Sequence, residues 1–176
     1  MKHLVAVLCL LLTGCVGLPE NVKPVENFNL EKYLGTWYEI ARLDHSFERG
    51  LTRVTATYSL RSDGGVKVVN RGYSAEKQRW KEAVGKAYFV NGPKLGYLKV
   101  SFFGPFYGAY IVFELDHEQY QYSLVSGPDK SYLWILARNP IIKASTNDFL
   151  IAKAAALGFD THKLIFVEQQ KNPQGK

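Results

Sequence analysis

Hydrophobic and polar residues alternate along several segments of the chain, as they do in β-strands with one buried face. In residues 52–60, TRVTATYSL, the side chains of Val54, Ala56 and Tyr58 share one face, while threonine and serine occupy the other. The segment RSDGG that follows has the residues of a tight turn, and Val68 continues the same face on the return strand. This part of the sequence therefore predicts a β-hairpin with one face in water.

Six other segments resemble strands and are separated by short breaks such as NGPKLG, GPFYG and GPDKS. No helix-length pattern lies between them, so parallel β-α-β units are disfavoured and an antiparallel meander is expected. Together with the hairpin, these segments make eight predicted strands. The six segments are residues 35–43, 79–90, 97–103, 109–115, 120–126 and 132–138.

One convincing helix follows the last of these strands. Ser145 or Thr146 can cap it, FLIAKAAAL supplies strong helix formers, and Gly158 ends it. A short final strand is predicted within residues 163–169. The predicted fold class is all-β: an eight-stranded antiparallel up-and-down β-barrel with one C-terminal α-helix on its outside and a short final strand. Closing the sheet removes both edges and leaves an interior for one small ligand.

Composition agrees with a single β-rich domain. The chain has 176 residues, of which 47% are hydrophobic and 14% aromatic, and alanine, leucine and glutamate do not dominate as they do in helical bundles. The formal charge of +6 comes from lysines and arginines scattered along the chain. This spacing indicates a solvated basic surface with a weak attraction to anionic lipid headgroups, and no nucleic-acid partner is expected.

The first residues have the pattern of an export signal. Lys2 is followed by an apolar run from Leu4 to Leu12 that is too short to span a bilayer. The sequence LTGC that ends at Cys15 looks like a bacterial lipobox, in which the cysteine thiol receives a diacylglycerol and becomes the acylated N-terminus. An ordinary secretory signal with an incidental cysteine is the alternative. Since Cys9 leaves with the signal, the mature chain has no disulfide.

These features divide the chain into four parts. Residues 1–14 are predicted to be the signal peptide. Residues 15–28 are predicted to be the lipidated N-terminus and a tether, because VGLPENVKPVENF has two prolines and little periodicity. Residues 29–170 are assigned to the barrel domain and residues 171–176 to a C-terminal tail.

The first strand begins with a glycine and a tryptophan. Trp37 is large and flat enough to close the narrow end of a barrel, and Gly35 allows the chain to approach closely there. Arg138 ends the eighth strand, which barrel closure brings next to the first. We therefore predict that the Arg138 guanidinium lies over the Trp37 ring and donates hydrogen bonds to nearby carbonyls.

Gly35 and Trp37, the turn GPDKSY and Arg138 together resemble the lipocalin family. The segments YLGTWYEIAR, FERGL, VTATYSL, KVSFFGPFYG and YLWILAR are most similar to a bacterial branch of outer-membrane lipoproteins that resembles apolipoprotein D. The resemblance covers about residues 27–170 and agrees with the lipobox. Many secreted lipocalins tie their C-terminal segment to the barrel with a disulfide. This chain cannot, so helix docking is expected to rest on packing alone.

The resemblance implies binding and not catalysis: storage or transport of fatty acids, lysophospholipids or similar lipids in the bacterial envelope, for membrane maintenance under stress. It implies no cofactor. Val16 follows Cys15 where retention in the inner membrane usually requires aspartate. The resemblance therefore implies a lipid-anchored protein of the outer membrane, on its periplasmic face. The sequence leaves open whether the protein is a monomer or a homodimer.

Side-chain parity predicts the lining of the barrel, because alternate residues of a barrel strand face the interior. On the eighth strand both faces are buried, and the resemblance places Trp134 inside. Tyrosine hydroxyls near the mouth are expected to hold a polar head group. The predicted ligand-binding residues are Ala56, Tyr58, Val68, Val100, Phe102, Tyr110, Val112, Tyr132 and Trp134.

No catalytic residue and no metal site are predicted. His45, His117 and His162 lie in predicted loops without a second ligand at metal spacing, so they are expected to be solvated. No G-x-S-x-G elbow, Gly-rich phosphate loop or CxxC motif is present. Two alternatives remain. One is a barrel enzyme that acts on a bound lipid. The other is an interaction module whose aromatic loop, residues 102–108, touches the membrane, folds over the barrel or contacts a second subunit.

Overall fold

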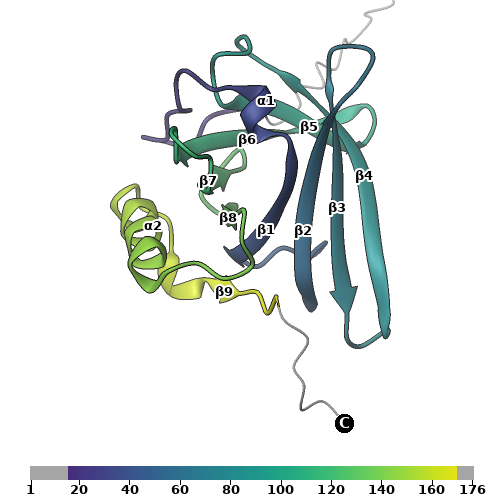
Figure 1. Ribbon diagram of the computed structural model, residues 1–176, viewed down its shortest axis with the longest axis vertical. Coiled ribbons are helices and arrows are strands. Elements are labelled where there is room, and N and C mark those ends of the chain that lie inside the picture. The colour runs from purple at the N-terminus through teal and green to yellow at the C-terminus, as the bar shows by residue number, and fades with distance from the viewer. Residues whose placement is uncertain (1–15, 170–176) are drawn as a thin grey trace, which may run out of the picture.

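A computed structural model describes residues 16–169, in which strands β1 to β8 form a closed antiparallel barrel (Figure 1). The predicted fold class is confirmed. The predicted signal peptide, Cys15 and residues 170–176 lie outside the described residues. The barrel strands are β1 (Gly35–Arg42), β2 (Leu51–Leu60), β3 (Val66–Ser74), β4 (Arg79–Phe89), β5 (Tyr97–Phe103), β6 (Phe106–Leu115), β7 (Tyr122–Ser126) and β8 (Leu133–Ala137).

The barrel closes because β1 pairs on both of its edges. One edge pairs with β2, where Trp37 lies opposite Ala56, and the other pairs with β8, where Tyr38 lies opposite Ala137. The remaining barrel strands each pair with their neighbours in sequence, which is the predicted meander. A ninth strand, β9 (Ile165–Phe166), pairs with the last residues of β1 and is much shorter than predicted.

The aromatic segment between β5 and β6 is a strand tip and not a loop. Phe106 begins β6 and pairs with Phe103 of β5, so only Gly104 and Pro105 remain between the two strands. The prediction that residues 102–108 form a loop was therefore wrong. The cross-strand pair of phenylalanines continues the β5–β6 ladder into the segment whose glycines suggested a longer turn.

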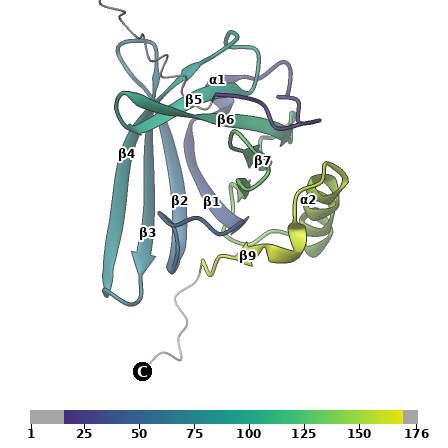
Figure 2. The same cartoon turned by 180° about the vertical axis from the view of Figure 1, so that it is seen from behind.

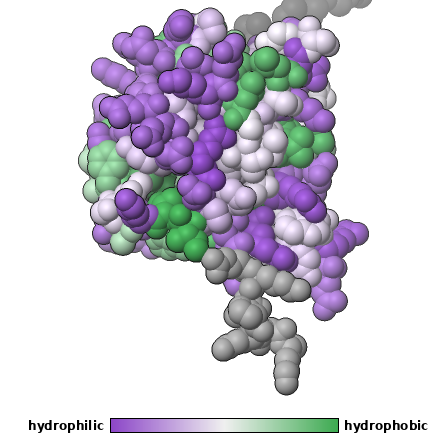
Figure 3. Space-filling model, viewed as in Figure 1, coloured by the Kyte–Doolittle hydropathy of each residue, from purple (hydrophilic) through white to green (hydrophobic). Residues whose placement is uncertain are grey.

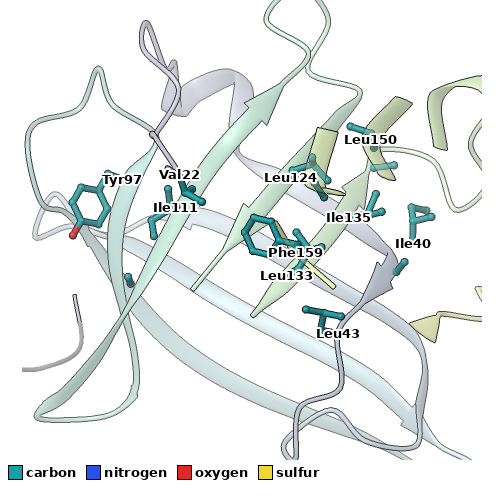
Figure 4. Close-up of a cluster of buried hydrophobic side chains, with 14 residues drawn as sticks. Val22, Ile40, Leu43, Tyr97, Ile111, Leu124, Leu133, Ile135, Leu150 and Phe159 are labelled. Atoms are coloured by element: carbon teal, nitrogen blue, oxygen red, sulfur yellow. The ribbon is translucent and has the colours of Figure 1, made fainter. Parts of the chain in front are cut away.

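The helix α2 (Ala144–Ala156) packs against the outside of the barrel. Its buried residue Leu150 belongs to one hydrophobic cluster with Leu124 of β7 and Ile135 of β8 (Figure 4). Lys143 occupies the N-cap position without a side-chain hydrogen bond, so the predicted cap by Ser145 or Thr146 was wrong. Both residues lie inside the first turn.

Away from the contact with α2, the surface of the molecule carries both polar and apolar side chains. The face in Figure 3 is largely hydrophilic, with hydrophobic residues gathered in small separate patches. Among residues 16–169, no helix combines the length and the apolar character needed to cross a bilayer.

The segment that precedes the barrel is packed on it. Val22 and Phe28 are almost fully buried. The Val25 amide donates to the Val112 carbonyl at 2.8 Å, and the Gly96 amide donates to the Val25 carbonyl at 2.9 Å. Figure 2 shows the segment crossing the outside of β6. The prediction of a tether was therefore wrong for residues 16–28, because the apolar side chains of Val22 and Phe28 were sufficient to dock a segment without regular periodicity.

The short helix α1 (Leu30–Tyr33) covers one end of the barrel, above the ring of Trp37. The Trp37 indole is fully buried and donates from Nε1 to the Tyr33 carbonyl at 2.8 Å. Its ring centroid lies 4.7 Å from that of Tyr33. Closely packed, tilted aromatic rings and a satisfied indole N–H therefore seal this end, which we call the closed end.

Arg138 lies over Trp37, as predicted, with its guanidinium carbon 4.0 Å from the ring centroid. Its Nη1 donates to the Thr36 carbonyl at 2.9 Å, and its Nη2 donates to the Lys32 and Leu34 carbonyls at 2.7 and 2.9 Å. One side chain thus satisfies carbonyls from α1, from the α1–β1 connection and from β1.

Replacing Arg138 with alanine should lower the free energy of unfolding by about 2 to 3 kcal/mol, because the cation–π contact is lost and several carbonyls lose a donor. Arg138→Lys should recover only part of this loss, since an ammonium group cannot present the planar fork. Chemical denaturation of both variants measures the effect. Curves that coincide with wild type would show that the guanidinium does not hold the closed end.

Candidate functional site

Two hydrophobic clusters separate the outer and inner faces of the barrel wall. On β8, Leu133 and Ile135 belong to the outer cluster with α2, while Trp134 and Leu136 belong to the inner cluster. The predicted side-chain parity of β8 is therefore confirmed. The inner cluster lines the lumen and gathers residues from α1 and the barrel strands.

Eight of the nine residues predicted to bind a ligand lie in the inner cluster. The ninth, Tyr132, directly precedes β8 and stacks on His45, with 4.7 Å between the ring centroids. Val112 is fully buried, whereas Trp134 keeps part of its surface exposed. The structure brings these residues together, and their contact with a ligand stays a prediction. The eight are Ala56, Tyr58, Val68, Val100, Phe102, Tyr110, Val112 and Trp134.

A small cavity lies within the inner cluster, beside α1. The cavity has a volume of about 10 Å³, which is roughly the room that one water needs. A long acyl chain therefore reaches this end of the lumen only if side chains move. The lining residues are Phe28, Leu30, Tyr33, Tyr58, Val66, Val68, Ala87, Leu98, Val100 and Tyr110.

Three tyrosine hydroxyls meet at the closed end. The Tyr110 hydroxyl lies 2.8 Å from that of Tyr33 and 2.7 Å from that of Tyr58. The Tyr33 hydroxyl is also 3.2 Å from Ser123 Oγ, and burial raises the pKa of Tyr33 to about 12. These hydroxyls stay neutral and bind one another. Tyr58 and Tyr110 lie beside α1, so the expectation that tyrosine hydroxyls near the mouth hold a head group does not concern them and stays a prediction.

A buried charged cluster lies at the opposite end, which we call the mouth. Arg42 ends β1, and its Nη1 donates to Glu39 Oε1 at 2.7 Å. Its Nη2 donates to the Glu48 carbonyl at 2.8 Å, and Trp134 Nε1 donates to Glu48 Oε2 at 2.9 Å. All three charged residues are at most 6% exposed. Such groups are costly to bury and are retained where they are paired.

His45 is part of the same wall, so the prediction that it is solvated was wrong. Its ring stacks between Phe47 and Tyr132 and lies 4.8 Å from the Trp134 ring. Burial and the nearby Arg42 lower the pKa of His45 to about 4, which keeps the imidazole neutral. Glu48 lies in the β1–β2 connection, and its hydrogen bond from Trp134 holds this connection against the barrel wall. His45 lies in the same connection and is therefore buried as well.

Electrostatics favour a proton on one of the two glutamates. Burial raises the pKa of Glu39 well above its usual value, and the neighbouring Glu48 raises it further, while Arg42 opposes both effects. Burial also raises the pKa of Glu48, while the hydrogen bond from Trp134 and the charge of Arg42 oppose this effect. Arg42 Nε and His45 Nε2 are buried without a protein partner. The mouth therefore combines a paired cation, a carboxyl pair and two unused polar atoms beside an apolar lumen.

Sequence reasoning missed this cluster for a geometric reason. Glu39 follows Trp37 by two residues, so simple alternation already places it inside. Arg42 is three residues further on and would point outward without a shift in register. A bulge between Glu39 and Ala41 changes the phase, and Arg42 then lies opposite Trp134. Glu48 carries no periodic signal because it lies in a connection.

Within residues 16–169, no group of histidine, cysteine and carboxylate side chains is arranged to hold a metal ion. His117 is an exposed turn residue between β6 and β7, as expected, and His162 lies exposed before β9. Neither contributes to the mouth or to the closed end.

Comparisons with known proteins agree with this architecture. A family model described as a lipocalin-like domain matches residues 28–169. The chain is 61% identical over 171 residues to the outer membrane lipoprotein Blc of Vibrio cholerae, covering 97% of this chain and 100% of that protein. It is 55% identical over 151 residues to Blc of Escherichia coli K12, covering 86% of this chain and 85% of that one.

More distant proteins share the fold. Apolipoprotein D of Macaca fascicularis is 36% identical over 155 residues, covering 85% of this chain and 81% of that protein. Among solved structures, insecticyanin from the tobacco hornworm Manduca sexta has a TM-score of 0.70 at 21% identity, covering 88% of each chain. At that identity the likeness concerns the fold alone.

The raised pKa of Glu39 predicts how stability depends on pH. Its stabilising protonated form is fully present below the pKa of an unfolded glutamate and is lost as pH rises through the folded value. Between those two values wild type should lose about 1.4 kcal/mol per pH unit from this group.

Glu39→Gln mimics the protonated acid, so its stability relative to wild type should increase from pH 5 to pH 8 in urea denaturation. The exposed Glu82→Gln is the control and should show no such trend. A Glu39→Gln variant that is equally destabilised at both pH values would contradict a protonated Glu39.

Proposed function

Because the chain belongs to the lipocalin family, we propose that its barrel binds one lipid with a long acyl chain, such as a fatty acid or a lysophospholipid. The observation that carries this proposal is that apolar and polar side chains occupy different parts of the lumen. An apolar wall extends from the closed end to Trp134, and the buried polar groups Glu39, Arg42 and Glu48 are gathered at the mouth. A ligand with an apolar chain and one polar end matches that contrast.

The position of the ligand in the barrel is inferred from where the lumen has room and where its polar groups lie. The closed end is filled by mutually bonded tyrosines, so an acyl chain of the ligand occupies the lumen between Val100 and Trp134 and reaches toward the small cavity. The polar head then lies near Arg42, whose Nε has no protein partner. In the proposed pose the predicted lumen residues contact the chain, while Tyr132 stands at the rim.

The protein is a lipid-anchored protein of the outer membrane, as are the close relatives named outer membrane lipoprotein. The anchor that we propose is an acylated Cys15, with the barrel on the periplasmic face. Storage or transport of lipids at that membrane, in its maintenance under stress, is the biological role that we propose for this site.

A barrel enzyme is the second candidate, and one observation favours it. Glu39 and Glu48 are two neighbouring buried carboxyl groups that the sequence did not reveal, and burial raises the pKa of both, as it does for catalytic acids. Incubation with a lysophospholipid followed by mass spectrometry of the lipid separates the two functions. The binding proposal expects the lipid to be recovered unchanged, whereas hydrolysed or isomerised lipid would favour the enzyme.

A charge placed inside the lumen should weaken binding. Val100→Asp puts a carboxylate beside the acyl chain without a partner, and we expect at least a tenfold rise in Kd for a long-chain fatty acid, measured by calorimetry. Val84→Asp is the matched control, because Val84 is 53% exposed and lies on β4 away from the inner cluster. It should leave Kd unchanged.

Trp134 fluorescence reports where the ligand lies. Ligand should change the emission of the protein with saturation near one lipid per barrel, and Trp134→Phe should abolish most of that change. Equal losses of affinity in Val100→Asp and Val84→Asp, or an emission change that survives in Trp134→Phe, would place the ligand outside the lumen.

Replacing Cys15 with serine should release the protein from membranes into the soluble fraction, because no acyl chain can then be attached. Fractionation of cells followed by immunoblotting measures this release. Retention of Cys15→Ser in the outer-membrane fraction would contradict the proposed anchor.

A further inference from the structure

The folded domain begins directly after the proposed acylation site. The Tyr97 hydroxyl donates a hydrogen bond to the Val16 carbonyl, and Pro19 and Val22 are buried a few residues further on. Consecutive Cα atoms are only about 3.8 Å apart. An acylated Cys15 would therefore be joined to the outside of the barrel without an intervening tether, and the barrel surface near Val16 must lie against the bilayer that holds the acyl chains.

The barrel surface next to Val16 is rich in aromatic and basic side chains. Between Tyr97 and the β5–β6 tip, the outer surface of β4, β5 and β6 carries six aromatic or basic side chains that are partly or fully exposed, and we call these six the β4–β6 face. Lys99 Nζ lies 5.1 Å from the Tyr107 ring centroid, and the rings of Tyr107 and Tyr88 are 6.4 Å apart. The face consists of Lys86, Tyr88, Lys99, Phe103, Phe106 and Tyr107.

At the tip of this face two phenylalanines stand in solvent. Phe103 is 82% exposed and Phe106 is 66% exposed, more than any other large hydrophobic side chain among residues 16–169. Two exposed phenyl rings next to tyrosines and lysines match the interface of a bilayer, where aromatic rings enter the headgroup layer and lysines reach anionic phosphates. Asp63, an acidic residue at the edge of the face, accepts from Tyr88 and is paired with Arg61, so its charge is already compensated. Glu82 of β4 is exposed further along the strand, toward the β3–β4 turn.

We propose that the β4–β6 face lies on the bilayer that carries the acyl anchor, with Phe103 and Phe106 inserted among the headgroups. The proposal rests on the acylation of Cys15 that is part of the proposed function. Its occupant is the lipid surface itself, because the start of the folded chain at Val16 fixes which side of the barrel can reach the membrane.

This contact fixes the orientation of the barrel. Val16 lies beside Tyr97, the first residue of β5, and the tip begins at Phe103, the last. At about 3.3 Å per residue the two points are about 20 Å apart. When both touch the membrane, β5 lies along the surface and the rim of the mouth at its far end meets the lipid. Helix α2, on the opposite side of the molecule from β4 in both views, faces away (Figures 1 and 2). A lipid can then pass from the headgroup layer into the lumen without crossing much water.

A second copy of the chain is the other occupant that an exposed aromatic tip can have. The direct connection between Val16 and the anchor favours the membrane, since it brings the face to the lipid surface whether or not a second copy is present. The experiment below separates the two.

Spin labels on the lipidated full-length chain test the orientation. Gly104→Cys places a label at the tip, where an added Cβ meets no atom within 4 Å. Ala155→Cys places a matched label on the exposed face of α2. In vesicles of phosphatidylethanolamine and phosphatidylglycerol, the Gly104 label should be about tenfold less accessible to an aqueous nickel complex than the Ala155 label. Equal accessibility of the two labels, on protein that floats with the vesicles, would overturn the proposal and leave the anchor intact.

Two further results complete the test. Replacing both Phe103 and Phe106 with serine should raise the accessibility of the Gly104 label severalfold. Ile141→Ser, which removes an equally exposed apolar side chain elsewhere, should not. Unchanged protection in the double variant would overturn the role of the tip. Dipolar broadening between Gly104 labels would show that a second copy covers the face and would also overturn the proposal. Failure of wild type to float would contradict the anchor itself, and with it this orientation.

Discussion

The guanidinium of Arg138 is the group on which the sealing of the closed end depends most directly. It lies on the ring of Trp37 and donates to carbonyls of Lys32, Thr36 and Leu34, which belong to α1 and the chain that enters β1. Arg138 itself directly follows β8, so this one side chain joins the last barrel strand to the first. With that end sealed, we place the entry of ligands at the mouth.

Buried polar groups at the two ends of the lumen are satisfied in different ways. At the closed end the hydroxyls of Tyr33, Tyr58 and Tyr110 bind one another and stay neutral. At the mouth, charges are kept: Arg42 is shared between Glu39 and the Glu48 backbone, and its Nε is left unused. A self-satisfied cluster stabilises the fold, whereas an incompletely satisfied one has capacity to bind a polar group. This difference is the physical basis for placing the ligand head at the mouth.

Much of this architecture could be predicted from the sequence. Period-two alternation found the strands, and the pairing of Trp37 with Arg138 followed from their places on strands that closure brings together. The predictions failed where a local irregularity replaces periodicity. A bulge in β1 turned Arg42 inward, and a connection without any repeat carried Glu48 and His45 into the wall. The docking of residues 16–28 depends on the isolated side chains Val22 and Phe28, which carry no pattern until the barrel exists to receive them.

The central claim is that the lumen holds a single lipid. Native mass spectrometry of the protein purified in mild detergent from its own envelope tests this most directly, because it separates covalent acyl groups from a lipid bound without a bond. The account predicts one non-covalent lipid with a long acyl chain per barrel, in addition to the mass of the acylated Cys15. Barrels that carry only the covalent acyl groups, and that take up no lipid when lysophospholipid is added, would contradict it.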